Sequence, residues 1–128
     1  MANEIEVSIS ISASKGGMSV ARSENFKADM DGDAMTHSVQ AIGTSETLLV
    51  ESAAITNAGW VVIKNLDGSA SVEIGREGAD ADEYPIELLA GQSCVFRASD
   101  QDTGSADLGI YAKASSADTN VEYVIIEQ

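Results

Sequence analysis

The sequence predicts an all-β protein, a two-sheet antiparallel sandwich with jelly-roll-like connectivity and about ten short strands. Apolar and polar residues alternate over many short segments, the pattern of strands with one buried face. Segments rich in Gly and Asp separate these stretches, and no stretch has convincing amphipathic helical periodicity. A chain of 128 residues can bury a core without metals or disulfides, so we expect a single domain spanning residues 1–128.

The N-terminal third begins with a strict alternation over residues 4–12. Ile5, Val7, Ile9 and Ile11 share one side, opposite Glu and Ser. Lys15-Gly16-Gly17 then tolerates positive φ, and the alternation resumes at Met18, which predicts a hairpin. Residues 1–12 are expected to serve as an N-terminal arm or edge strand, with the four apolar residues as its interface.

Further strands are expected along the rest of the chain. Residues 45–54 fit either a short buried strand or a brief helix, and the β-rich surroundings favour the strand. Asp67-Gly68 is predicted to be a hairpin turn. The other expected strands cover 35–42, 60–65, 71–74, 86–89, 94–97, 108–114 and 121–125.

The net charge of -14 argues against nucleic-acid and membrane partners, because it repels phosphates and anionic headgroups. The N-terminus has neither a positive region nor an apolar run typical of a secretory signal, and Cys94 is the single cysteine. Synthesis in the cytoplasm fits both observations.

Residues with catalytic or metal-binding chemistry are few. His37 and Cys94 lie outside any catalytic motif, and no acid, base and orienting group assemble, so no enzymatic activity is expected. Asp29, Asp31 and Asp33 match the first half of a calcium-binding EF-hand loop. That match fails at Ala34, where Gly is needed, and at Gln40, where Glu is needed. We expect no cofactor, with a non-EF-hand Ca²⁺ site at these three aspartates as the alternative.

Several short pieces form an ordered set in the second half of the chain. They are Gly59–Asp67, Val72–Gly75, Leu89–Arg97, Ile110–Ala114 and Val121–Tyr123. This set, over about residues 59–127, resembles a group of small β-rich virion proteins of tailed bacteriophages. Scaffold roles are expected for Trp60, Asn65, Asp67, Gly75, Gly91, Arg97, Tyr111 and Tyr123. The two glycines are expected at strand ends, the two tyrosines on adjacent strands, and Arg97 in a pair with a loop carboxylate.

The resemblance implies a non-enzymatic virion structural protein that acts as a symmetric homo-oligomer, with a trimer favoured. The expected function is capsid decoration (a cement protein), stabilising the head by binding the major capsid protein. The alternatives are a tail-tube or head-tail connector component and a carbohydrate- or receptor-binding sandwich. For that last alternative, Tyr84 is the aromatic residue expected to be exposed.

Overall fold

The computed structural model describes residues 3–30, 35–49, 58–76, 84, 86–98 and 110–127. These residues form strands and connecting turns without helices, which confirms the predicted all-β class. Contacts divide the chain into two compact units, residues 1–31 and 32–128. The strands are β1 (Ile5–Lys15), β2 (Met18–Ala28), β3 (Met35–Ile42), β4 (Thr47–Leu48), β5 (Ala58–Asn65), β6 (Val72–Arg76), β7 (Ile86–Leu88), β8 (Ser93–Arg97), β9 (Ile110–Ala114) and β10 (Thr119–Glu127).

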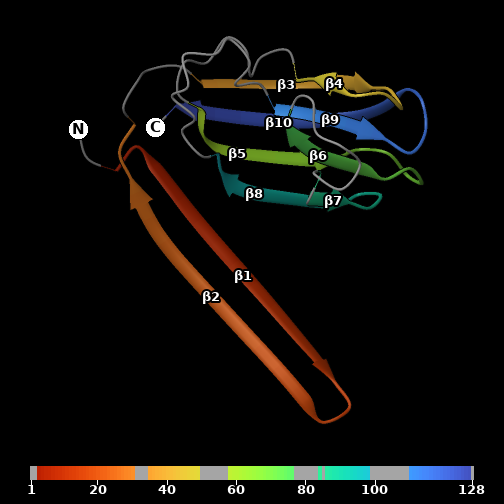
Figure 1. The fold of residues 1–128 in the computed structure, drawn as a ribbon. Helices are drawn as coiled ribbons and strands as arrows, with labels where there is room; N and C mark the ends of the chain where they lie inside the picture. Colours follow the sequence, from red (N-terminus) through yellow and green to blue (C-terminus); the bar gives the residue numbers. More distant parts are fainter. Residues whose placement is uncertain are drawn as a thin grey trace. The chain divides into compact units, whose positions relative to one another are not determined.

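The first unit is the predicted hairpin. β1 and β2 pair antiparallel over their full length, from Ile5 opposite Ala28 to Lys15 opposite Met18 (Figure 1). Gly16 and Gly17 form the two-residue turn with φ of 60° and 83°. Two successive positive φ angles match the twist of the flanking strands, and glycine adopts them without steric cost. The prediction of this turn is confirmed.

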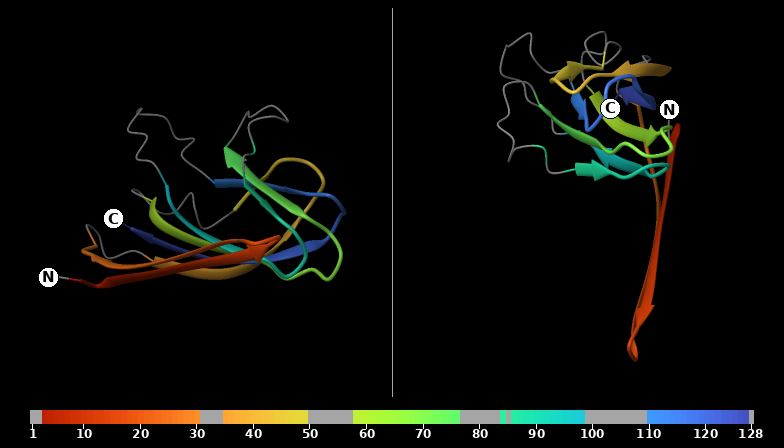
Figure 2. Two further views of the ribbon diagram at one scale, coloured as in Figure 1. Left: turned by 90° about the horizontal axis from the view of Figure 1, so that it is seen from below. Right: turned by 90° about the vertical axis from the view of Figure 1, so that its right-hand side faces the viewer.

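The second unit contains two four-stranded antiparallel sheets. One sheet has the order β3-β10-β5-β8 and the other the order β4-β9-β6-β7. Consecutive strands of this unit lie in different sheets, with the exception of β6 and β7. Figure 2 gives two further views of these strands. Two interleaved four-stranded sheets of this order are a jelly roll, so the predicted connectivity is confirmed.

The core lies between these two sheets. Alternate side chains of several strands fill it, as in β10, where Val121, Tyr123 and Ile125 are buried. Ala112 and Ala114 of β9 belong to the same core cluster. β9 and β10 lie in different sheets, so the expected pairing of Tyr111 and Tyr123 on adjacent strands is wrong. Ala112, Ala114 and Tyr123 instead meet in the core between the two sheets, where the small alanine side chains leave room for the tyrosine ring.

The predicted hairpin turn at Asp67-Gly68 is also wrong. β5 and β6 belong to different sheets, and residues 66–71 form the corner between them. Asn65 is fully buried at the start of this corner, and its Nδ2 donates to the carbonyl oxygens of Ala70 (2.8 Å) and Leu88 (3.1 Å). Its Oδ1 accepts from the backbone N–H of Asp67 (3.0 Å). The turn-forming residues therefore shape a connection between sheets, where local turn chemistry resembles that of a hairpin.

Asp67 completes the corner through its own carboxylate. Oδ1 accepts hydrogen bonds from the backbone N–H groups of Ala70 (2.7 Å) and Ser69 (2.8 Å). These bonds favour the ionised form and lower the pKa of Asp67 below its usual 3.8. Asn65 and Asp67 thus both bond to the backbone of this corner.

We expect this carboxylate to make stability depend on pH at the acid end. Because its pKa is lower in the folded state, its contribution is complete above about pH 3.8 and is lost as pH falls through the folded-state value. Asp67→Asn should therefore flatten the acid limb of the pH–stability curve, measured by urea unfolding between pH 2 and pH 6. An acid limb as steep in the variant as in wild type would contradict this assignment.

The two glycines expected at strand ends differ in position. Gly91 has a φ of 77° in the turn between β7 and β8, as expected. Gly75 lies inside β6, opposite Tyr111 of β9, and so is not at the strand end. In the ambiguous segment, Thr47 and Leu48 form β4 and Leu49 is buried, which agrees with the strand over that part. Residues 50–54 lie outside the described residues.

Candidate interaction surface

Of the three proposed calcium ligands, the structure describes only Asp29. Asp29 follows β2, and its Oδ1 accepts a hydrogen bond from the backbone N–H of Asn3. Asp31 and Asp33 lie outside the described residues. Across the described ranges, no group of three or more His, Cys, Asp or Glu side chains is placed to hold a metal ion. The calcium alternative stays a prediction.

The two side chains weighed as nucleophile and base lie on different strands. His37 is on β3, an edge strand, where its Nε2 lies 3.1 Å from Glu122 Oε2 at the surface. Cys94 is half-buried on β8, packed against the core, and burial raises the pKa of its thiol. A raised pKa keeps the sulfur protonated, which suits a packing role better than nucleophilic attack.

Tyr84 is buried, so its expected exposure is wrong. Its hydroxyl donates to Glu46 Oε2 (2.8 Å), and Lys113 Nζ lies 4.3 Å from the centre of its ring. Burial and the nearby Glu46 carboxylate raise its pKa. Because the hydroxyl and the ring face are both engaged within the protein, Tyr84 does not offer the exposed platform that a sugar-binding site needs.

The outer face of the sheet β4-β9-β6-β7 carries charged side chains. Lys113 Nζ is 3.6 Å from Glu73 Oε2, and Glu73 lies directly opposite Glu87 on β7. The like-charged pair Glu73–Glu87 is unfavourable in itself, and Lys113 offsets it from the other side. This face is therefore polar and acidic.

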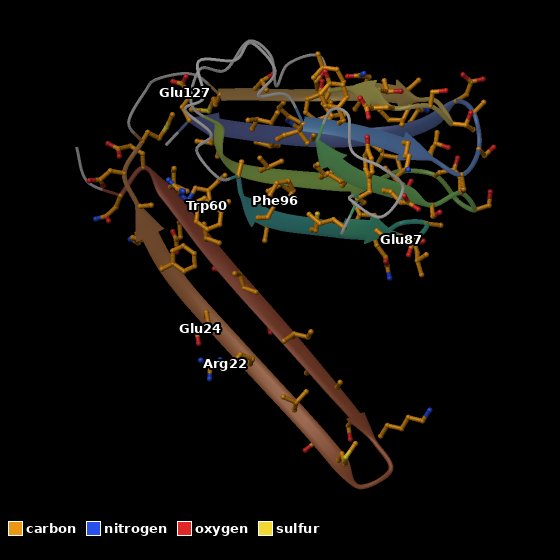
Figure 3. The ribbon with its side chains drawn as sticks, viewed as in Figure 1. Arg22, Glu24, Trp60, Glu87, Phe96 and Glu127 are labelled. Atoms are coloured by element: carbon orange, nitrogen blue, oxygen red, sulfur yellow. The ribbon has the colours of Figure 1, made fainter. Side chains whose placement is uncertain are left out.

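The hairpin has one polar and one apolar face. The register places Ser8, Ser10 and Ser12 on one face with Asn25 and Ser23. The opposite face, which we call the hairpin apolar face, carries most of the apolar side chains of the hairpin. It also bears one ion pair on β2, in which Arg22 Nη2 lies 2.8 Å from Glu24 Oε1 (Figure 3). The large apolar members of that face are Ile5, Val7, Ile9, Ile11, Met18, Val20 and Phe26, with Ala13 and Ala28 beside them.

On the hairpin apolar face, the side chains at the start of β1 are buried and those nearer the turn are exposed. Of the four predicted interface residues, Ile5 and Val7 are buried. Ile9 and Ile11 are exposed, Ile11 by 63%, and so are Met18 (77%), Val20 and Phe26. Alternation alone predicts a buried apolar face, and beyond Val7 that expectation is wrong. A two-stranded hairpin has no third layer to cover such a face.

The outer face of the sheet β3-β10-β5-β8, which we call the outer sheet face, carries both apolar and charged side chains. Glu122, Lys64 and Arg97 lie on it together with the apolar residues. Its middle row runs from His37 through Val124 and Val62 to Val95 on four neighbouring strands. Val62 is 40% exposed. The rows on either side begin with Met35 and Val39, both exposed on edge strand β3.

Sequence reasoning did not single out the outer sheet face as a functional surface. Val62 belongs to the unbroken apolar run from Trp60 to Ile63, whose members fall on opposite faces of β5. Such a run was a usable signal, since a strand with one wet face alternates instead. Trp60 on β5 lies opposite Arg97 on β8. Trp60 is half-buried and Arg97 is exposed.

Comparison with family models, with curated proteins and with solved structures gives no match in any of the three. The resemblance to phage virion proteins therefore stays a prediction. Among the described residues, no helix has the length and hydropathy needed to cross a membrane.

Proposed function

We propose that this protein is a non-enzymatic structural protein of a bacteriophage virion, a decoration protein that stabilises the head by binding the major capsid protein. The observation that supports the proposal best is the hairpin apolar face, with Ile9, Ile11, Met18, Val20 and Phe26 exposed on one side of a two-stranded element. Apolar area gathered in this way marks a protein-binding surface.

The form of the hairpin also suits docking to a protein assembly. Each strand has 11 residues, about 35 Å of extended chain, which gives the hairpin a long face for contact. Residues 5–28 carry three basic side chains (Lys15, Arg22 and Lys27) and two acidic ones (Glu6 and Glu24), whereas the whole chain has a net charge of -14. The hairpin is therefore where a strongly acidic protein can approach acidic protein neighbours with least repulsion.

The jelly roll is a well-packed unit in itself. Its buried residues fill the space between the sheets, and the hydrogen bonds of Asn65 and Asp67 fix one of its corners. A decoration protein acts through extended contact area rather than through a pocket. This protein fits that mode of action, because its exposed apolar side chains lie on the hairpin and its packed core lies in the jelly roll.

We expect Ile11→Asp to weaken binding to particles at least about 10-fold, because a charge would have to be buried at the docking surface. The measurement is co-sedimentation of the purified protein with undecorated heads of the phage that encodes it. Ser12→Asp is the matched control, since it adds the same charge one residue away on the polar face. It should bind like wild type.

Two other results would overturn parts of the proposal. Equal binding by both variants would remove the hairpin apolar face from the docking surface. Antibody labelling of purified virions tests the location independently: label over the head supports decoration, and label at the tail or neck supports the tail-tube or connector alternative. Unlabelled particles would reject the virion assignment.

A further inference from the structure

Among the strands that the structure describes, β2 has a neighbour on one side only. β1 and β2 form a sheet of two strands, so the outer edge of β2 is open (Figure 1). The ladder with β1 runs over 11 residues without a register shift, β2 contains no proline, and every residue of β2 except Ala28 is exposed. A long, regular edge of this kind accepts another strand, and proteins often prevent that with a bulge, a proline or a shorter strand. The ligand that fits such an edge is an extended backbone.

The turn of the hairpin determines which residues of β2 present their backbone to this edge. The two-residue turn at Gly16 and Gly17 closes on a hydrogen-bonded pair, Lys15 with Met18. Hydrogen-bonded pairs recur at every second residue of an antiparallel ladder, so the even-numbered residues of β2 bond to β1. The backbone N–H and C=O groups of the outer edge therefore belong to Ser19, Ala21, Ser23, Asn25 and Lys27.

A second copy of β2 fits this edge over its full length in one register. Ser23 is the middle residue of β2, and its backbone faces outward. Two β2 strands related by a twofold axis at Ser23 pair antiparallel over all 11 residues, with the two Ser23 residues opposite each other. Arg22 then lies opposite Glu24 of the second copy, and Val20 lies opposite Phe26 of the second copy.

The charges on β2 favour this register over its neighbours. Within one copy the ion-paired side chains of Arg22 and Glu24 are still 76% and 54% exposed, and each has donors or acceptors for a second partner. Around the twofold axis two arginines and two glutamates alternate, so each charge has only opposite charges beside it. Sliding the strands by two residues in either direction instead places Arg22 opposite Arg22, or Glu24 opposite Glu24, which is destabilising.

The edge of β1 lacks this complementarity. Two β1 strands paired about their middle residue, Ser10, would place Lys15 opposite Ile5 and would bring no opposite charges together. Ile5 and Val7 are also buried at the start of β1, whereas β2 is exposed along nearly its whole length. Of the two open edges of the hairpin, the edge of β2 is therefore the one that matches itself.

We infer that β2 of one copy pairs antiparallel with β2 of a second copy of this chain, in the register centred on Ser23. This pairing goes beyond the proposed function and does not depend on it. The product is a four-stranded sheet of order β1-β2-β2-β1, with the apolar faces of both hairpins on the same side. The dimer thus widens the hairpin apolar face and leaves it open to a further protein. It is a different oligomer from the trimer that the resemblance implies.

Exchanging charges across the axis tests this register in solution, without virions. Wild type should sediment at twice the chain mass of 13.3 kDa. Arg22→Glu and Glu24→Arg each set like charges opposite one another, so each should weaken the dimer at least about 10-fold. An equimolar mixture of the two variants should dimerise like wild type, and so should the double variant, because each glutamate then faces an arginine. Lys15→Glu is the matched control, since it changes the net charge as Arg22→Glu does but lies beside the turn on β1. It should not weaken the dimer.

Cross-linking tests which strand forms the contact. Ser23→Cys and Ser10→Cys, each in a Cys94→Ala chain, are a matched pair because the two serines lie directly opposite each other in one hairpin. In the dimer the two Ser23 positions are about 5.5 Å apart, whereas the two Ser10 positions are separated by three strand spacings, about 14 Å. A thiol-reactive cross-linker shorter than the second distance should therefore join Ser23→Cys chains and leave Ser10→Cys chains single.

Each other outcome overturns the inference. A monomeric or trimeric wild type would exclude the twofold contact, and a dimer that neither charge variant weakens would be held by another surface. Cross-linking of Ser10→Cys chains alone would show that β1 forms the contact. Binding to heads by a monomeric wild type would leave the proposed function standing without this inference, and a dimer held by β2 that does not bind heads would do the reverse.

Discussion

Replacing Asn65 by Ala should lower the free energy of unfolding by about 3 kcal/mol. The side chain is fully buried and makes three hydrogen bonds, to the carbonyl oxygens of Ala70 and Leu88 and from the backbone N–H of Asp67. Truncation removes all three bonds and leaves buried backbone groups without these partners, which costs more than the bonds themselves contribute. Thermal unfolding should show a midpoint lower by on the order of 10 °C.

Two further variants separate the hydrogen bonds of Asn65 from the space that it fills. Asn65→Asp keeps the size and the acceptor atom but loses the Nδ2 donor and sets a carboxylate against two carbonyl oxygens, so it should be at least as destabilising as Asn65→Ala. Ser69→Ala removes one long hydroxyl contact to Asp67 (3.3 Å) at the surface and should change stability by less than about 0.5 kcal/mol. A stable Asn65→Asp variant would contradict the role of the donor.

The strands were largely predictable because burial on one face imposes a period of two. β3 begins and ends at the predicted residues, Met35 and Ile42, and β10 buries the predicted alternate residues. The hairpin was equally clear, since its turn depends on Gly16 and Gly17, which are adjacent in sequence. These features depend on local geometry, which a single segment of sequence records.

Which strands pair could not be read from the same local signals. Asp67 and Gly68 have the residue types of a hairpin turn, yet the chain there crosses from one sheet to the other. Tyr111 and Tyr123 follow one another along the chain on strands that lie in opposite sheets. Sheet membership depends on contacts between residues far apart in sequence, and turn chemistry is compatible with both kinds of connection.

The exposed apolar side chains differ in how far the sequence indicated them. Ile9 and Ile11 were expected to form an interface because they are apolar and alternate near the N-terminus, and both are exposed. For Val62 the only signal was the unbroken apolar run Trp60–Ile63. Val39 carried none, since an apolar residue in a strand is usually in the core. Tyr84 was expected to be exposed and is buried. The sequence did not indicate this, because its partners Glu46 and Lys113 are distant in sequence.

Replacing Tyr123 by Ala should cost about 3–5 kcal/mol, the range for losing a large aromatic side chain from a core. Tyr123 is 1% exposed on β10, the strand that pairs with both β3 and β5. A cavity there lies under the middle of the sheet, where the surrounding strands cannot easily collapse to fill it. Urea unfolding of the whole chain measures the loss.

The hydroxyl of Tyr123 can be tested separately from its ring. It donates to Gln40 Oε1 (3.1 Å), and Gln40 Nε2 donates in turn to the carbonyl oxygen of Leu48 (2.8 Å). This chain of bonds links β10 and β3 of one sheet to β4 of the other. Tyr123→Phe should therefore cost only about 1 kcal/mol, and the remainder of the Tyr123→Ala effect belongs to the ring. If Tyr123→Phe were as destabilising as Tyr123→Ala, the polar link between the two sheets, rather than the packed ring, would be the main contribution of Tyr123 to the stability of the jelly roll.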